Sequence, residues 1–544
     1  MVEVEFQQKT KELIDSLKNI CATNGLGNNA SEFDIITQTF LYKFLSDKFA
    51  FEAKKLSPKL AEADKWEEEL LNLSDQEFKK LQRRLGDTDT AILQPQHLIA
   101  HLFSKQNEPD FAKLFDDTLI DIAKQNNDVF AVMTDTGEKV QLFTRISENV
   151  TVSKRDAFSR AIINKIAEFS FERIFTQKFD FYSTIFEYLI KDYNSNSGGK
   201  YAEYYTPHAV ARIMAEILVP KEQQGKIKNV SCYDPSAGSG TLLMNVAHAI
   251  GENRCSIFTQ DISKKSSNLL RLNLILNNLV HSIPNVIEGD TLRHPHHKDG
   301  KDLKSFDFIV SNPPFKLDFS DIHAELDGKE HKERFFAGVP NVTAKAKDKM
   351  AIYQLFLQHI IKSLKPNGKA AVVVPTGFVS AKSGIDKTIR KYLVENKMLA
   401  GVISMPSNIF ATTGTNVSII FIDNSNNENV ILLDASKMGV KIQEGKNQRT
   451  VLLEQEESKI IETFTNHLVE EHFSVLASYK DIEKKNYSLN AGHYFDVKIV
   501  HEHISIGTYN SRIEEIENEI DEMFRLSTSL DKKIKTSIRG LKFD

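Results

Sequence analysis

The sequence predicts an α/β protein built on a Rossmann-like, mostly parallel sheet, with an N-terminal helical domain and a C-terminal helical tail. Three observations lead to this prediction. Apolar residues recur at helical spacing over residues 1–170, and from about residue 228 to 423 short apolar strands alternate with helical stretches. A long charged stretch with an a/d apolar pattern lies near the C-terminus.

Length and composition set limits on the class of protein. At 544 residues the chain is too long for one core. It contains no run of 18 apolar residues, and its charged start "MVEVEFQQKTKELID" lacks the apolar core of a signal peptide. Its three cysteines are too scattered for a disulfide framework or a zinc site. We expect a cytoplasmic protein without a membrane partner.

The charge balance constrains how the chain could hold nucleic acid. The net charge is −5 and the pI is about 6.4. A protein that grips duplex DNA alone usually carries a strong positive excess, because neutralising phosphates supplies much of the affinity. If the chain binds DNA, local basic patches or a partner chain must therefore supply much of the affinity.

The first domain is predicted over residues 1–170. In "SEFDIITQTFLYKFLSDKF", Phe33, Ile36, Phe40 and Phe44 recur at helical spacing and form one apolar face. A helical domain packed on itself explains this face without a ligand.

The second domain is predicted over residues 171–480, after a change to the Ser-, Asn- and Gly-rich loop "KDYNSNSGGKYAEYYTP". Its strand candidates are "NVSCYD", "CSIFTQD", "PNVIEGD", "DFIVSN", "KAAVVVP", "LAGVISMP" and "NVSIIFID". Helical patterns fall between several of them, which indicates a parallel sheet covered on both faces. In such sheets ligands bind at the carboxyl ends of the strands.

The first three strand ends have the features of a nucleoside site. The first runs into a tight turn that starts at Asp234, in which Gly238 and Gly240 allow positive φ and close approach of a ligand to the backbone. The second ends in Asp261, where a carboxylate can accept both hydroxyls of a ribose. The third ends in Asp290, where a carboxylate can meet an adenine amino group.

The glycine turn favours one nucleoside cofactor over another. A glycine turn followed by an acid also fits NAD, but this turn reads D-P-x-x-G-x-G instead of G-x-G-x-x-G. The leading carboxylate of Asp234 would repel a pyrophosphate, whereas it suits a sulfonium and an α-amino group. We therefore expect S-adenosyl-L-methionine.

The fourth strand, "DFIVSNPPF", ends in a motif with its own chemistry. The side-chain oxygen of Asn312 and the carbonyl of Pro313 can accept hydrogen bonds from the two N–H groups of an adenine amino group. This draws the nitrogen toward sp³ geometry and aims its lone pair at the methyl donor. Pro313 and Pro314 fix the backbone, and Phe315 offers a face for stacking. A base inside a duplex must be flipped out to reach this site.

These motifs resemble a known family. "DPSAGSG" followed by "NPPF" is similar to N6-adenine DNA methyltransferases, and nearly the whole chain resembles the modification (HsdM) subunit of type I restriction-modification systems. The resemblance includes "FLYKFLSDKF", "KYAEYYTPHAVARIM", "GDTL", "VVVPTGFV", "IRKYLVEN" and "GVISMPSNIFATTGTNVSIIFI". It implies an S-adenosylmethionine-dependent methyltransferase fold and activity.

The resemblance also implies the residues that hold the cofactor. They are Glu203, Tyr204, Tyr205, Thr206, Pro207, His208, Ser239, Gly240 and Thr241, with Asp261 on the ribose. The chain departs from the family pattern at three of these positions. The family more often has Gln at 203, Arg at 208 and Glu at 261, and the shorter Asp261 must reach further.

Motif order points to partner subunits. Only about 120 residues follow the last predicted strand, and the insert over residues 316–348 is too short for a target-recognition domain. A separate specificity subunit must then read the DNA sequence, and the resemblance implies two copies of this chain for each one. The predicted C-terminal segment, 481–544, carries a helical seam that packs on such a partner or on this chain's own helices. Whether a restriction/translocase subunit joins is left open.

The seam consists of Ile513, Ile516, Ile520, Met523, Leu530 and Ile534.

Functions other than adenine methylation in double-stranded DNA also fit parts of this sequence. The same chemistry could act on cytosine N4, an RNA base or a glutamine amide, or the chain could be a catalytically silent assembly module. A dinucleotide oxidoreductase leaves "NPPF" unexplained. His294, His296 and His297 lie in "LRHPHHKDG", which we interpret as a solvated loop and not a metal site, because no cysteine or well-spaced carboxylate completes it.

Overall fold

The computed structural model of the chain describes residues 2–27, 30–172, 175, 206–342, 346–410, 416–425, 428–444, 447–495 and 505–540. It divides into two compact units, Met1–Tyr494 and Phe495–Asp544. Within the described ranges, no helix combines the length and the apolar character needed to cross a bilayer.

The first part of the larger unit is helical, as predicted. Its main helices are α1 (Val2–Thr23), α2 (Ala30–Leu56), α5 (Asp75–Gly86), α6 (Ile99–Lys105), α7 (Phe111–Gln125) and α9 (Arg155–Ala167), with the short helices α3 (Pro58–Ala61), α4 (Trp66–Leu71) and α8 (Asn127–Phe130). Phe33, Ile36, Phe40 and Phe44 of α2 are all buried, so their spacing does mark the face that packs in the core.

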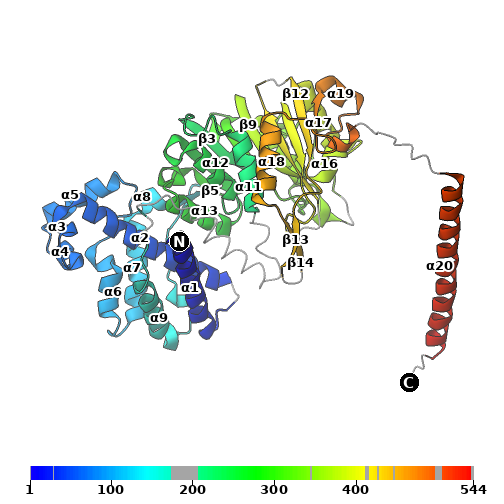
Figure 1. Ribbon diagram of the computed structural model, residues 1–544. Helices are drawn as coiled ribbons and strands as arrows, with labels where there is room; N and C mark the ends of the chain where they lie inside the picture. The colour runs from blue at the N-terminus through cyan, green and yellow to red at the C-terminus, as the bar shows by residue number, and fades with distance from the viewer. Residues whose placement is uncertain are drawn as a thin grey trace. The chain divides into compact units, whose positions relative to one another are not determined.

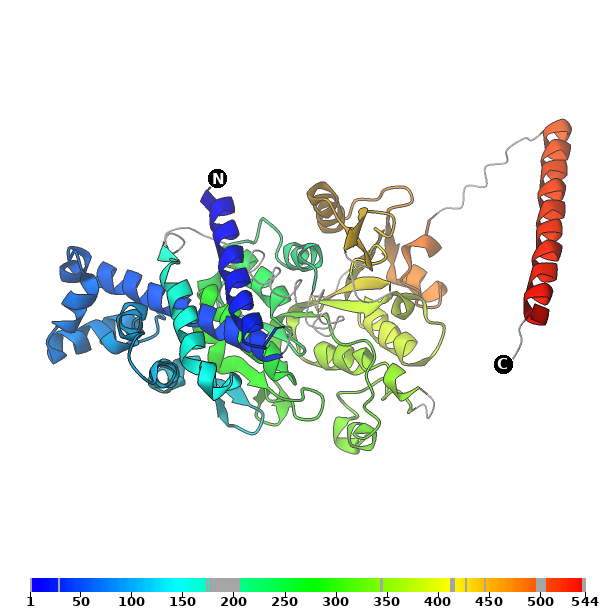
Figure 2. The same ribbon diagram turned by 90° about the horizontal axis from the view of Figure 1, so that it is seen from below.

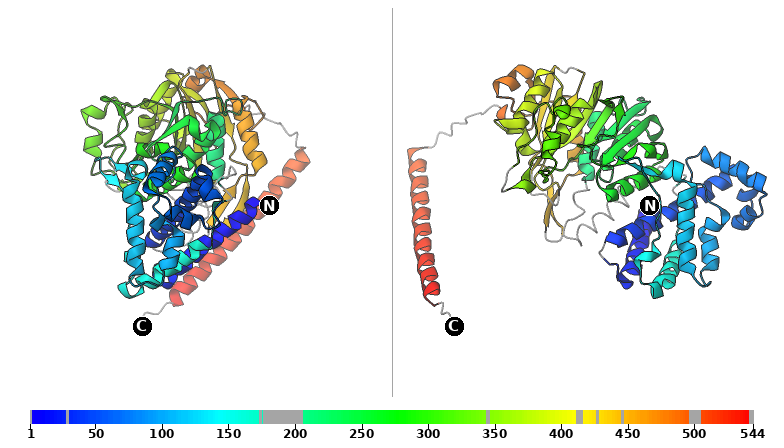
Figure 3. Two further views of the ribbon diagram at one scale, coloured as in Figure 1. Left: turned by 90° about the vertical axis from the view of Figure 1, so that its left-hand side faces the viewer. Right: turned by 180° about the vertical axis from the view of Figure 1, so that it is seen from behind.

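A sheet of 11 strands forms the centre of the larger unit (Figures 1 and 3). All seven predicted strands occur in it, as β3 (Val230–Asp234), β4 (Cys255–Asp261), β5 (Val286–Glu288), β8 (Phe306–Ser311), β9 (Leu364–Pro375), β10 (Leu399–Ser404) and β11 (Val417–Asp423). The strand order is β15-β12-β10-β11-β9-β8-β3-β4-β5-β1-β2.

Strand direction determines which ends of the strands lie together. β3 is parallel to β4 and β8, β4 is parallel to β5, and β8 is parallel to β9. β11 runs antiparallel to both β9 and β10, so β10 points the same way as β8. The carboxyl ends of β3, β4, β5, β8 and β10 therefore lie at one edge of the sheet.

Helices cover both faces of the sheet (Figure 2). One layer contains α11 (His208–Leu218), α12 (Thr241–Ile250) and α18 (Glu454–Thr465), which contact one another through α11. The other contains α15 (Tyr353–Lys362) and α17 (Gly384–Glu395), which are also in contact. α13 (Lys264–Leu276) follows β4 and packs against α2 of the helical part. Burial on both faces explains the near-continuous apolar strands.

Several strands were not predicted. They are β1 (Val132–Thr134), β2 (Lys139–Val140), β6 (Lys298–Asp299), β7 (Asp302–Leu303), β12 (Asn429–Asp434), β13 (Val440–Glu444), β14 (Asn447–Val451) and β15 (Ser474–Ser478). β1 pairs in parallel with β5, so part of the predicted helical domain extends the sheet. β12 to β15 follow Asp423, where the last predicted strand ends.

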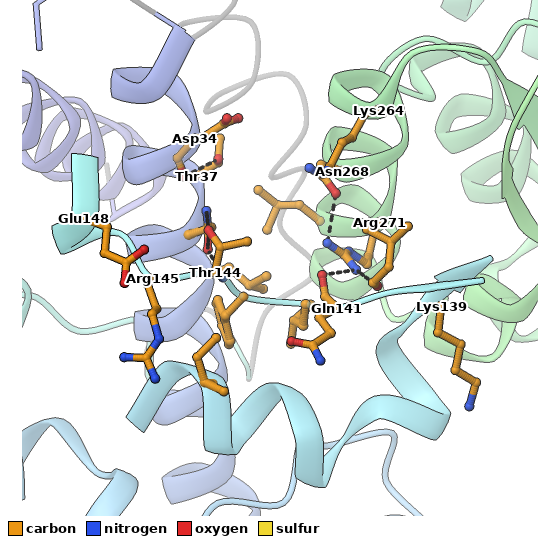
Figure 4. A pocket seen from close by; sticks show the side chains of 17 residues that line it. Asp34, Thr37, Lys139, Gln141, Thr144, Arg145, Glu148, Lys264, Asn268 and Arg271 are labelled. Atoms are coloured by element: carbon orange, nitrogen blue, oxygen red, sulfur yellow. Dashed lines mark hydrogen bonds between the residues drawn. The ribbon is translucent and has the colours of Figure 1, made fainter. Parts of the chain in front are cut away.

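Arg271 of α13 connects the helical part to the sheet. Its buried guanidinium donates hydrogen bonds to the carbonyls of Val140 at 3.0 Å, Gln141 at 3.1 Å and Phe130 at 3.4 Å, and to Asn268 Oδ1 at 2.9 Å. Desolvation lowers its pKa to about 10, so it is still charged at neutral pH. It lies beside a cavity of about 540 Å³ between α2, residues 139–145 and α13 (Figure 4).

Replacing Arg271 with Met should destabilise the larger unit, because the carbonyls of Phe130, Val140 and Gln141 would lose the donor that they share, and the first of these bonds is buried. Unpaired buried polar groups cost on the order of 1–3 kcal/mol each. We expect a clear fall in the melting temperature, measured by calorimetry. Lys264→Met, at an exposed position lining the same cavity, is the control and should melt as the wild type does. Equal melting of both variants would contradict this role of Arg271.

The smaller unit contains one long helix, α20 (Ile506–Gly540), of 35 residues. Every residue of the predicted seam is exposed, from 39% for Ile513 to 61% for Met523. Among the described residues of this unit, therefore, none covers the seam.

Candidate active site

The site residues predicted at strand ends meet at the carboxyl edge of the sheet. Asp234 ends β3, Asp261 ends β4, and Asn312 follows Ser311, the last residue of β8. The register pairs Tyr233 with Ile309 in β8, and Asp234 with Thr259 in β4. Parallel pairing thus places these groups next to one another although they are far apart in the sequence.

Asp234 is a buried acid that is stabilised by hydroxyl and amide donors. Its Oδ1 accepts hydrogen bonds from the Ser311 hydroxyl at 2.8 Å and from the Ser236 backbone N–H at 3.0 Å. The two serine hydroxyls are 2.7 Å apart. Desolvation raises the pKa of Asp234 to about 7, and the nearby charge of Asp261 adds to this, while the serine hydrogen bonds oppose it. Among the described residues no cation pairs with it.

The glycine turn is fixed by close contacts with α13. Gly238 and Gly240 have φ of 54° and 84°, and a Cβ at Gly240 would collide with the side chain of Leu270. Asn273 Nδ2 donates to the carbonyl of Ser239 at 2.6 Å, which fixes the turn from the side of α13. This leaves the turn with little freedom and no side chain at position 240.

Asp261 bridges the turn and the end of β4. Its Oδ2 accepts from the Gly238 N–H at 2.9 Å and its Oδ1 from the Ser263 N–H at 2.8 Å. Desolvation raises its pKa, against these two backbone hydrogen bonds. A carboxylate has about four acceptor positions, so each oxygen can still accept one more hydrogen bond.

Asp290 lies after β5 and caps the next turn. Its Oδ1 accepts from the N–H groups of Leu292 at 2.9 Å and Arg293 at 3.2 Å. The hydroxyl of the intervening Thr291 donates to the carbonyl of Pro235 at 2.7 Å. The Asp290 turn is therefore tied to the segment between Asp234 and the glycines.

Asn312 is connected to the segment that precedes the glycine turn. Its Nδ2 donates to the hydroxyl of Thr206 at 3.3 Å, across 106 positions of sequence. With Nδ2 oriented toward Thr206, the carboxamide oxygen is left as an acceptor, and among the described residues no donor reaches it. Pro313 is buried and Pro314 is exposed. Phe315 is half-buried, with its ring centre 6.4 Å from that of Tyr353 at a near-perpendicular angle.

The other predicted cofactor residues divide into three groups. Glu203, Tyr204 and Tyr205 lie outside the described residues. Pro207 precedes α11, and His208 begins it, near enough to Glu457 to act on that carboxyl's pKa. Thr241 begins α12, with its hydroxyl 3.0 Å from that of Ser239.

The histidine loop differs from its prediction. His294 and His296 are exposed, but His297 is half-buried, packs its ring against Tyr233 and donates to the Thr259 carbonyl at 3.0 Å. Desolvation lowers its pKa to about 4. The prediction of a solvated loop is therefore wrong for His297, because the loop folds back over the aromatic side chains behind β3.

Four residues of the site were missed by sequence reasoning. They are Ser236, Asn273, Thr291 and Ser311, all of them small polar residues that hold a predicted residue in place. The signal was present for Ser311, since a hydroxyl that ends an apolar strand directly before Asn312 must be buried with a polar partner.

This strand order, with β11 antiparallel between two strands of common direction, is that of an S-adenosylmethionine-dependent methyltransferase fold. The chain belongs to the family described as N-6 DNA methylase, whose sequence model matches residues 177–503.

Relatives and solved structures agree with this assignment. The chain is 28% identical over 403 residues to the methylase subunit of the type I restriction enzyme MpnII from Mycoplasma pneumoniae, covering 72% of this chain and 70% of the relative. It is 26% identical over 403 residues to the MjaIX methylase subunit from Methanocaldococcus jannaschii, covering 70% and 67%. In fold it is similar to a type I restriction-modification methyltransferase subunit from Streptococcus thermophilus. That match has a TM-score of 0.71 and 22% identity, and covers 90% of this chain and all of the other.

The raised pKa of Asp234 predicts a pH dependence of stability. An acid whose folded pKa lies above its unfolded value contributes stability that is complete below pH 4 and is lost as the pH rises to about 7. Asp234→Asn mimics the protonated form. The wild type should therefore lose stability relative to this variant between pH 5 and 7, on the order of 1.4 kcal/mol per pH unit. Above pH 7 the difference should level off.

Melting curves of both proteins over this range provide the measurement. Asp307→Asn is the control, because Lys365 and the Ser231 donors outweigh desolvation and lower the pKa of Asp307. Its difference from wild type should stay constant between pH 5 and 7. A constant difference for Asp234→Asn as well would show that this carboxyl does not titrate in the range.

Proposed function

We propose that this chain is the methylation subunit of a type I restriction-modification system and transfers a methyl group from S-adenosyl-L-methionine to N6 of an adenine flipped out of DNA. The observation that carries the proposal is the Asn312 carboxamide. Thr206 orients it through Nδ2, and it lies at the sheet edge that also holds Asp234 and the glycine turn. Family membership and the type I methylase relatives support the same reading.

The residues of the cofactor half fit S-adenosylmethionine. A buried carboxylate with a raised pKa and no cationic partner among the described residues suits a ligand that brings positive charge. The Gly238–Gly240 turn presents backbone, and Asp261 keeps two acceptor positions for ribose hydroxyls. When bound, the cofactor supplies a methyl group activated by a sulfonium.

The full proposed set for the cofactor is Glu203, Tyr204, Tyr205, Thr206, Pro207, His208, Asp234, Gly238, Ser239, Gly240, Thr241, Asp261 and Asp290.

Asn312 and Pro313 form the acceptor half of the site, the part that binds the adenine that accepts the methyl group. The lone pair of the adenine amino nitrogen is delocalised into the ring, so the nitrogen is a poor nucleophile. The Asn312 oxygen and the Pro313 carbonyl accept hydrogen bonds from its two N–H groups. These hydrogen bonds localise the lone pair on the nitrogen and stabilise the positive charge that develops there during methyl transfer. Because the following proline fixes the chain, the Pro313 carbonyl is held in position before the base arrives.

Phe315 provides the stacking surface. Its half-buried ring packs edge-on against Tyr353, whose hydroxyl donates to Asp386 at 2.7 Å. A flipped base gains stacking energy on such a ring, which offsets part of the cost of leaving the duplex.

The partner that reads the DNA sequence is proposed to be a specificity subunit, with two copies of this chain around it. A 35-residue helix with exposed Ile516 and Ile520 suits a helical partner, because apolar residues at a/d spacing are stable in water only when covered. A net charge of −5 also fits shared rather than solitary DNA binding. A restriction/translocase subunit would be a further partner.

Asn312→Ala should abolish methyl transfer and leave cofactor affinity largely intact, because it removes an acceptor of the target amine. Asp261→Ala is the reciprocal variant and should weaken cofactor binding by about tenfold or more. Labelled-methyl transfer to DNA in the presence of the specificity subunit measures the first effect, and calorimetry with the cofactor measures the second. Nucleoside analysis of the product identifies N6-methyladenine against N4-methylcytosine.

Substantial activity in Asn312→Ala would remove the proposed role of the carboxamide. Unchanged affinity in Asp261→Ala would remove the ribose assignment and leave the acceptor half untouched.

Disrupting α20 should separate this chain from its specificity subunit. Ile516→Asp with Ile520→Asp places charges in the seam without changing the first unit, so co-purification should be lost while cofactor affinity stays at the wild-type value. Glu517→Gln, on the same turn of the helix, is the control and should co-purify normally. If the double variant still co-purifies, the seam is used within the chain.

A further inference from the structure

The hairpin β13–β14 projects from the same edge of the sheet that carries the active site. β12 is parallel to β10, and β10 is parallel in direction to β8, so Asp434 at the end of β12 lies at the edge where Asn312 follows β8. The hairpin begins at Val440, six residues later. Figure 1 shows it extending downward from the sheet.

The base of the hairpin is anchored by hydrogen bonds. The Thr450 N–H donates to the carbonyl of Asn408 at 3.0 Å, and the Thr450 hydroxyl donates to the carbonyl of Ser407 at 2.6 Å. Gly439, with φ of 89°, donates its N–H to Glu456 Oε1 at 2.8 Å. Ser407 and Asn408 follow β10, so these bonds fix the hairpin relative to the active-site edge.

Away from its base, the hairpin has exposed side chains on both faces. Val440 and Ile442 are 49% and 41% exposed on one face, and Lys441 and Gln443 are exposed on the other. An isolated two-stranded hairpin is only marginally stable in water. The exposed side chains of Lys441, Gln443 and Gln448 are therefore available to a partner outside the chain.

The two faces differ in chemistry. Cross-strand pairing of Gln443 with Gln448, and of Lys441 with Thr450, gives one polar face with two amides and an ammonium. The other face pairs Ile442 with Arg449 and Val440 with Val451. The sequences of the two strands contain Lys441 and Arg449 against the single acid Glu444, so the hairpin is basic in a chain whose net charge is −5.

A ribbon of this kind matches the major groove of DNA. The major groove admits a two-stranded β-ribbon, glutamine amides pair with the edge of adenine, and lysine pairs with guanine or phosphate. A protein partner would instead be expected on the opposite face, where Val440 and Ile442 are exposed. The polar face carries the amides, and its register is continuous with Thr450, the residue that anchors the hairpin to the active-site edge.

We propose that the β13–β14 hairpin enters the major groove of the duplex next to the methylated base, with Lys441, Gln443 and Gln448 facing the DNA. This proposal rests on the proposed function, because it takes the substrate to be duplex DNA. It assigns to this chain a DNA contact of its own, beside those of the specificity subunit.

The test compares the two faces of the hairpin in the assembled complex with the specificity subunit. One variant combines Lys441→Ala, Gln443→Ala and Gln448→Ala, and the matched control combines Val440→Thr and Ile442→Thr on the opposite face. The polar-face variant should raise the KM for DNA or lower DNA affinity about tenfold or more, with a smaller salt dependence, and leave cofactor affinity unchanged. The control should match the wild type.

Dimethyl sulfate protection gives a readout that a purely structural role would not move. Guanine N7 lies in the major groove, so guanines beside the target adenine that the wild-type complex protects should become reactive with the polar-face variant. Unchanged protection and unchanged KM would overturn the proposal, as would a loss of the specificity subunit from this variant. If the wild-type complex itself transfers no methyl group to DNA, the proposed function fails instead, so the two failures are distinguishable.

Discussion

The buried carboxylate of Asp234 is the interaction on which the rest of the site depends. It lies where β3 and β8 end side by side. Its carboxylate accepts a hydrogen bond from the hydroxyl of Ser311, the residue directly before Asn312. Because one oxygen of this acid accepts from both Ser236 and Ser311, the start of the glycine turn and the start of the Asn-Pro-Pro-Phe motif share one anchor. A shift at either strand end would move both halves of the site together.

Three further hydrogen bonds bring the remaining segments to this anchor. Thr291 reaches the carbonyl of Pro235, Asp261 holds the N–H of Gly238, and Thr206 holds the carboxamide of Asn312. Each joins residues from different strand connections, so the geometry of the site comes from the sheet and not from any single loop. Such support from packed elements is what keeps reacting groups at a fixed separation.

The parts of this architecture that were predictable have local causes. Continuous apolar runs identified seven strands, and the glycine turn and Asn312-Pro313-Pro314 lie where we predicted them, at the carboxyl ends of these strands. β1 and β2 span three and two residues and exist only because β5 offers a partner, so no periodicity reveals them. The hydrogen bond from Asn312 to Thr206 crosses 106 positions and depends on folding. His297 was predicted to lie in a solvated loop, whereas its ring packs against Tyr233, a contact that depends on the fold of the sheet.

The same acid also gives the protein two opposite responses to pH. Ionising Asp234 weakens the fold when nothing compensates its charge, yet a positively charged ligand favours the ionised form and must expel a proton to bind it near neutral pH. Affinity for such a ligand therefore rises over the very interval in which the protein alone becomes less stable. The ligand therefore contributes a larger share of the protein's stability at pH 7 than at pH 5.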